Sequence, residues 1–119
     1  MKIYSFEKLI VWQKSIDFST EVDKITRNYP KEELFGMVSQ MRRCAVSISS
    51  NIAEGSGRQS SKDKARFTEI AYGSALELLN QFIISLKLDY ITEDLYQERR
   101  KILEEITFML DKLHKSQLN

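Results

Sequence analysis

Apolar residues recur at intervals of three and four positions along four long segments of this chain. This spacing places apolar side chains on one face of an α-helix, whereas a half-buried β-strand would alternate them with a period of two. A single proline, Pro30, and four glycines leave few positions at which regular structure must stop. The pattern therefore predicts an all-α protein whose helices pack through their apolar faces.

Helix boundaries follow from the breaking and capping residues between these segments. Tyr29-Pro30 forces an extended break, Gly55 fits a left-handed position after a helix end, and Thr92 is a good N-cap. The predicted helices cover residues 6–27, about 31–54, 61–89 and 93 to about 115. With 119 residues and short connections, the chain is predicted to form one domain, an antiparallel up-down-up-down four-helix bundle.

Two apolar stripes define the predicted core of the first half. The stripe of the first helix is Leu9, Trp12, Ile16, Val22 and Ile25, with Trp12 as a core anchor. The stripe of the second helix is Leu34, Met37, Met41, Cys44, Ile48 and Ile52. Gly36 and Gly73 lie inside predicted helices, and we interpret both as places where another helix approaches closely.

Cys44 is the only cysteine of the chain, which excludes an intrachain disulfide and favours a reducing, cytoplasmic location. No histidine neighbours it in the sequence, so we interpret it as a small core residue rather than a nucleophile. The only histidine, His114, lies near the C-terminus and is interpreted as a surface or helix-end residue. The sequence thus predicts no catalytic residue, no metal site and no cofactor.

A polar line runs beside the apolar stripe of the second helix and consists of Arg43, Ser47, Ser50, Asn51 and Glu54. It is either a solvated face or a strip that contacts another subunit or lines a pore. Solvated faces usually carry Lys and Glu, whereas Ser and Asn are weak helix formers with small side chains. Small side chains let a second helix come close, which keeps the subunit contact open as an interpretation.

The third helix carries a second apolar stripe, formed by Tyr72, Leu76, Leu79, Ile83 and Tyr90, in addition to its core face. Two stripes exceed what one helix of a four-helix bundle needs to bury. We therefore predict that the second stripe lies in a homo-oligomer interface. The most apolar window, residues 70–91, includes Glu77, Lys87 and Asp89 and is too polar for a membrane span.

Positive charge is concentrated in residues 40–68, although the whole chain has a formal charge of only +1. Six basic and two acidic residues give this segment a net charge of +4. Its basic residues are Arg42, Arg43, Arg58, Lys62, Lys64 and Arg66. They are either a solvated end of the bundle or, when multiplied by oligomerisation, a nucleic-acid-binding surface.

Several motifs together resemble one known family. They are Phe6-Glu7-Lys8-Leu9-Ile10-Val11-Trp12-Gln13-Lys14, Tyr29-Pro30-Lys31-Glu32-Glu33, Met41-Arg42-Arg43, Val46-Ser47-Ile48, Ser50-Asn51-Ile52-Ala53-Glu54-Gly55, Gly57-Arg58 and Arg66-Phe67. The chain resembles the bacterial four-helix-bundle proteins encoded in intervening sequences of 23S ribosomal RNA genes, sometimes labelled ribosomal-protein-like. That family is similar to the accessory protein of diversity-generating retroelements, a barrel-shaped homopentamer with a basic surface that works with reverse transcriptase and RNA.

The resemblance implies a homopentamer of four-helix bundles, with RNA or a nucleic-acid enzyme as partner and no established enzymatic activity. Ser49 and Cys44 depart from it, since the family often has proline and alanine there. A helix-interior proline removes a backbone hydrogen bond and clashes, so Ser49 predicts a straighter second helix. The alternative function is a structural or protein-interaction unit that binds no nucleic acid.

Overall fold

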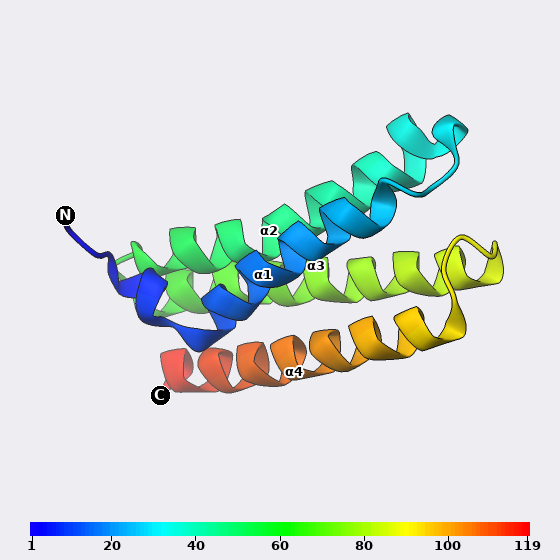
Figure 1. The fold of residues 1–119 in the computed structure, drawn as a ribbon. Helices are drawn as coiled ribbons and strands as arrows, with labels where there is room; N and C mark the ends of the chain where they lie inside the picture. Colours follow the sequence, from blue (N-terminus) through cyan, green and yellow to red (C-terminus); the bar gives the residue numbers. More distant parts are fainter.

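Four long helices and three short helical segments make up the computed structural model, which describes all 119 residues and contains no strand. The long helices are α1 (Ile10–Thr26), α2 (Ser39–Ser56), α3 (Ser61–Lys87) and α4 (Glu93–Leu118), and the short ones are η1 (Ser5–Lys8), η2 (Lys31–Glu33) and η3 (Leu34–Val38). Figure 1 shows the long helices running alternately up and down, with both termini at one end. The predicted all-α, antiparallel four-helix bundle is confirmed.

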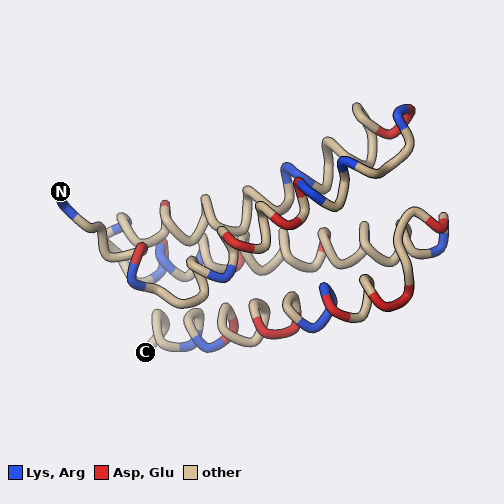
Figure 2. The backbone as a smooth tube through the Cα atoms, viewed as in Figure 1, with Lys and Arg blue, Asp and Glu red and all other residues tan.

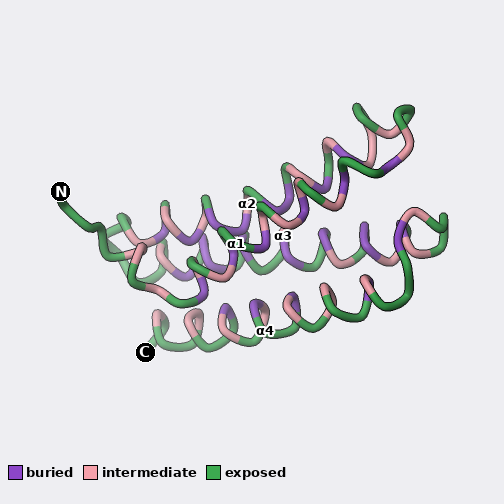
Figure 3. Tube along the Cα trace, in the orientation of Figure 1, coloured by how far each residue is buried: buried purple, intermediate pink, exposed green.

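The core lies between the four helices, and α3 has the most extensive packing, against α2 on one side and α4 on the other. Figure 3 shows the buried positions turned toward the inside of the bundle. Its fully buried large side chains are Phe18, Val22, Met41, Ile48, Leu78, Phe82, Leu103, Ile106 and Leu110. The rings of Phe18 and Phe82 lie 6.0 Å apart and join α1 to α3 across the centre. No helix is both long and apolar enough to cross a membrane.

Hydrogen bonds join the helices at both ends of the bundle. At the end that carries the termini and the α2–α3 turn, Thr68 Oγ1 donates to Gln117 Oε1 over 2.6 Å. At the other end, Tyr90 OH donates to Glu33 Oε2 over 2.7 Å, and the rings of Tyr29 and Tyr90 lie 5.1 Å apart. These contacts hold the α1–α2 connection against the α3–α4 connection.

The buried face of α1 differs from the predicted stripe. Ser15 and Thr26 are buried, whereas Ile16 is exposed and Trp12 is half-buried at the edge of the core. The hydroxyl groups tolerate burial because each donates to a backbone carbonyl of its own helix, Ser15 over 2.7 Å and Thr26 over 2.8 Å. The α-helix also begins later than predicted, because Leu9 is extended and residues 5–8 form a 3₁₀ turn.

The second helix does not start as one continuous α-helix near residue 31. A 3₁₀ turn and the π-helical segment η3 precede α2, and Gly36 inside η3 has non-helical angles of φ −110° and ψ −107°. A Cβ at Gly36 would meet only the Glu33 carboxylate, at 3.1 Å, so the predicted close helix contact is wrong. Leu34 and Phe35 are exposed there, and the apolar stripe becomes buried only from Val38 onward. From Ser39 the helix continues through the buried Ser49 without a break.

Gly55 lies inside α2 and does not adopt the predicted left-handed conformation. It is buried, and a Cβ added to it would lie 2.9 Å from the Cβ of Phe67. Gly55 is therefore needed because α3 approaches α2 closely, not because the chain turns there. Thr92 is an N-cap as predicted and accepts from Leu95 N over 3.2 Å, and Ser60 caps α3 by accepting from Asp63 N over 3.1 Å. At the C-terminus α4 continues to Leu118, past its predicted end.

Gly55→Ala is expected to lower the free energy of unfolding by about 2 kcal/mol, because the methyl group must displace Phe67. Gly73→Ala is the matched control, since a Cβ at this helical position meets nothing within 4 Å. It is expected to raise the free energy of unfolding by roughly 0.5–1 kcal/mol through helix propensity. Urea denaturation followed by circular dichroism measures both; equal effects would contradict the packing role of Gly55.

Candidate nucleic-acid and subunit interface

Three basic residues lie together at the α2–α3 turn, and we call Arg58, Lys62 and Arg66 the basic turn. Arg58 forms an ion pair with Glu54 over 3.0 Å, whereas Lys62 and Arg66 have no ion-pair partner. The guanidinium carbon atoms of Arg58 and Arg66 lie 4.6 Å and 5.4 Å from the centre of the Phe67 ring. The fourth predicted residue of this end, Lys64, is half-buried.

Arg42 and Arg43 lie elsewhere on α2. Arg58 follows Arg42 by sixteen positions, which along a helix would correspond to about 24 Å. Arg42 faces α1, where it pairs with Asp23 over 3.2 Å and donates to Thr26 Oγ1 over 3.0 Å. Arg43 is exposed, and its nearest hydrogen-bond partner is Ser39 at 3.5 Å. The six predicted residues therefore form two separate groups within one chain.

The charges of the bundle are distributed unequally over its faces, as Figure 2 shows by the long tan stretch in α3. Residues 44–53 of α2 carry no charge, and residues 70–86 of α3 carry only Glu77. By contrast, α4 has eleven charged residues, and ion pairs join it to α1, Lys14 to Glu105 over 3.1 Å and Arg99 to Glu21 over 3.0 Å. We call the outward side of residues 44–53 and 70–86 the uncharged face.

The second apolar stripe of α3 forms the part of this uncharged face next to α4, where Tyr72 and Leu110 line one hollow. Its last predicted member, Tyr90, lies beyond the end of α3 and donates to Glu33 instead. Tyr72 is 37% and Leu76 48% exposed, whereas Leu79 and Ile83 are half-buried against the core. Gly73 lies between the two exposed residues, and no atom of the chain lies within 4 Å of the place of its missing Cβ. The close approach predicted at Gly73 therefore does not occur within one chain.

The predicted polar line of α2 divides into two parts. Ser47 and Ser74 share a hydrogen bond of 2.8 Å between α2 and α3, and Asn51 donates to the Ser47 carbonyl over 2.8 Å. These two α2 side chains thus take part in packing within the chain. Ser50 is exposed, and Glu54 holds Arg58. The outward part of the line is therefore smaller than predicted.

Cys44 faces α3 and is buried, as predicted for a core residue. Its thiol donates to Glu77 Oε2 over 2.6 Å, and Gln81 Nε2 donates to the sulfur over 3.5 Å. Burial, followed by the Glu77 hydrogen bond and charge, raises the pKa of Cys44 from 9.0 to about 11. The thiol is therefore protonated at neutral pH and is a poor nucleophile.

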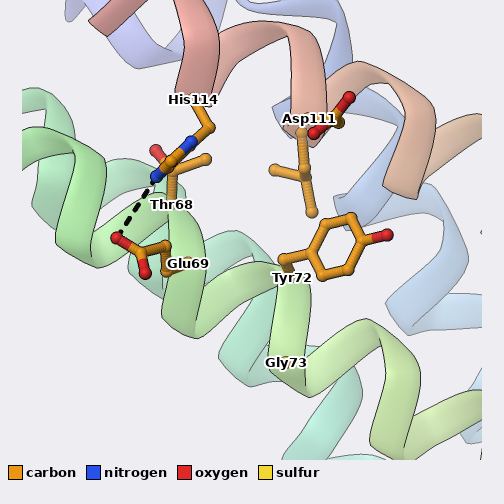
Figure 4. Close-up of a pocket in the computed structure, with 7 residues that line it drawn as sticks. Thr68, Glu69, Tyr72, Gly73, Asp111 and His114 are labelled. Carbon is orange, nitrogen blue, oxygen red and sulfur yellow. Dashed lines mark ion pairs between the residues drawn. The ribbon is translucent and has the colours of Figure 1, made fainter. Parts of the chain in front are cut away.

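A hollow of about 310 Å³ lies between α3 and α4 and is shown in Figure 4. His114 is half-buried on its wall, with Nε2 3.2 Å from Glu69 Oε2, so it faces α3 rather than lying free on the surface. Asp111 lines the same hollow. No three His, Cys, Asp or Glu side chains of the chain are grouped closely enough to hold a metal ion.

A family model matches residues 7–112, which is most of the chain, and describes the 23S rRNA-intervening sequence proteins. The chain belongs to this family. It is similar in structure to a protein of unknown function from the S23 ribosomal protein family of Bacteroides thetaiotaomicron, with 27% identity and a TM-score of 0.82. That similarity covers 89% of this chain and 96% of the other. A comparison with curated proteins gives no match.

Sequence reasoning missed two features of this 23S rRNA-intervening sequence family member. Phe35 is 94% exposed on η3, because the non-helical Gly36 turns the segment away from the core. Phe67 is buried, and the guanidinium groups of Arg58 and Arg66 lie over its ring. The sequence signal for this second feature is an arginine directly before a phenylalanine, Arg66-Phe67, near the beginning of α3. The ring packs against Gly55 near the end of α2.

Alkylation of Cys44 by iodoacetamide at pH 8 is expected to be about 100-fold slower in the native protein than in urea, because the thiolate is correspondingly rarer. Glu77→Gln removes a charge that raises the pKa and is expected to accelerate the native reaction. Glu69→Gln, elsewhere on α3, is the control and is expected to change nothing. Because the folded pKa is the higher one, the stabilising contribution of Cys44 is full below pH 9 and is lost by about pH 11. An unchanged rate in Glu77→Gln would contradict this role of the carboxylate.

Proposed function

We propose that this protein is a non-enzymatic homo-oligomer that assembles through the uncharged face and binds RNA through the basic turn. The observation that carries the proposal is the division of the surface. Ion-paired charges cover α1 and α4, whereas the middle of α2 and α3 has almost none and ends in Lys62 and Arg66 without ion-pair partners.

Assembly is supported by the large apolar side chains that α3 exposes to solvent. Tyr72 and Leu76 lie beside Gly73, where a neighbouring backbone has room to approach. Burying half-exposed side chains of this size gains roughly 1 kcal/mol each, and exposed apolar patches without charge are typical of protein contacts. A ring of five chains is the assembly implied by the family resemblance.

RNA binding is supported by the chemistry of the basic turn and its repetition in an oligomer. Phosphate groups attract Lys and Arg without regard to sequence, and released counterions supply much of the affinity. One chain with a formal charge of +1 has little overall attraction for RNA. Several copies of Arg58, Lys62 and Arg66 brought together would form a local positive field strong enough to hold a phosphate backbone.

A second candidate function is a protein-interaction module that binds no nucleic acid. It is favoured by the ion pairs of Arg58 with Glu54 and of Arg42 with Asp23, which partly neutralise the basic residues. In this case the uncharged face alone carries the function, and the basic turn only keeps the protein soluble.

Leu76→Glu is expected to convert the oligomer to monomers, because a carboxylate would be buried in the interface. Phe108→Glu is the matched control, since Phe108 is an exposed apolar residue of α4 outside the uncharged face. Light scattering at micromolar concentration measures the native mass, and circular dichroism verifies the helix content. A monomeric wild-type protein would overturn the assembly, and dissociation by Phe108→Glu alone would place the interface on α4.

Replacing Arg58, Lys62 and Arg66 together by Ala is expected to weaken RNA binding about tenfold or more. The slope of the logarithm of the binding constant against the logarithm of salt concentration is expected to fall by the contribution of about two phosphate contacts. The charge-matched control replaces Lys24, Lys31 and Lys87, three exposed lysines outside the basic turn. Fluorescence anisotropy of a labelled RNA fragment at several salt concentrations measures both. Absence of wild-type binding at low salt would leave the protein-interaction module as the function.

A further inference from the structure

The Arg58 guanidinium has two partners, a carboxylate and an aromatic ring. One nitrogen, Nη2, pairs with Glu54 Oε1 over 3.0 Å, and the guanidinium carbon lies 4.6 Å from the centre of the Phe67 ring. The backbone N–H of Arg58 donates to the Gly55 carbonyl over 3.1 Å. Side chain and backbone are thus both fixed, and the side chain is still 43% exposed.

Phe67 provides a rigid support for this arrangement. Its ring is only 7% exposed, because α3 packs against α2 where Gly55 has no side chain. Arg66 places a second guanidinium 5.4 Å from the same ring centre. The two planar cations therefore cover a buried aromatic ring and leave open surface toward the solvent.

We propose that this Arg58–Phe67–Arg66 cluster stacks the unpaired bases of single-stranded RNA. A guanidinium plane that rests on an aromatic ring offers its other side to a nucleobase, and proteins read unpaired RNA bases by such stacking. Lys62, one turn before Arg66 and without an ion pair, is placed to hold the adjoining phosphate. Bases inside a duplex are stacked on each other, so the cluster discriminates against double-stranded RNA.

The inference rests on the proposed RNA binding at the basic turn and adds which form of RNA is bound. Base stacking requires planar cations, whereas the attraction of phosphate groups requires only positive charge. Lys and Arg carry the same charge, but only Arg has a plane that stacks. An arginine-to-lysine substitution therefore separates the two contributions.

The test compares wild type, Arg58→Lys and Arg43→Lys by anisotropy with three labelled probes. The probes are a single-stranded RNA, a strand of the same length without bases, and an RNA duplex of that length. We expect wild type to prefer the single strand, and Arg58→Lys to bind it about tenfold more weakly, as loss of one stacked base predicts. We expect unchanged binding of Arg58→Lys to the strand without bases, and of Arg43→Lys to all three.

Each outcome decides between the proposals. Equal wild-type affinity for the strands with and without bases, equal affinity for single strand and duplex, or an unchanged Arg58→Lys overturns base stacking. RNA binding by charge survives those results if the triple Ala variant still loses affinity. Absence of binding to every probe at low salt overturns both. Should Arg58→Lys lose helix content, Arg66→Lys replaces it, because the exposed Arg66 has no ion pair to lose.

Discussion

The close contact between α2 and α3, tightest where Gly55 meets Phe67, determines much of the arrangement of this bundle. Because Gly55 has no Cβ, the end of α2 and the first turns of α3 come together without an intervening side chain. Ser47 and Ser74 continue the contact by a hydrogen bond, and Cys44 and Glu77 by another. Small and polar side chains therefore contribute to this contact in addition to the buried apolar side chains Met41 and Ile48.

This way of packing has a consequence for the surface. Glu77, which accepts a hydrogen bond from the Cys44 thiol, is the single charged residue in the middle of α3, so one carboxylate is the only charge on the uncharged face. The charged residues are instead paired across α1 and α4, which face water as ordinary bundle helices do. The proposed assembly through α2 and α3 and the proposed RNA binding both rest on this separation of charged and uncharged helices.

Periodicity was sufficient to predict four helices and their order, because each helix has a clear apolar face and few interruptions. Details that depend on single backbone contacts were not predictable. A serine such as Ser15 is buried in place of Ile16 only because its hydroxyl finds a carbonyl one turn away. The role of a glycine is equally ambiguous in the sequence. Gly55 permits close packing, Gly36 lies in a non-helical kink, and Gly73 has neither role within the chain. The sequence separation of Arg42 from Arg58 was sufficient to predict two groups of basic residues, but the pairing of Arg42 with Asp23 depends on the helix face that Arg42 occupies.

The hydrogen bond from Thr68 to Gln117 ties the end of α4 to the beginning of α3, beside the basic turn. Both ends of the chain therefore emerge where the candidate RNA-binding residues lie, and the opposite end, with Glu33 and Tyr90, is far from them (Figure 1). A purification tag or fluorophore fused to either terminus would stand next to Lys62 and Arg66, and an acidic tag would compete with phosphate there. A label attached in the α3–α4 connection would report on the bundle without entering that neighbourhood.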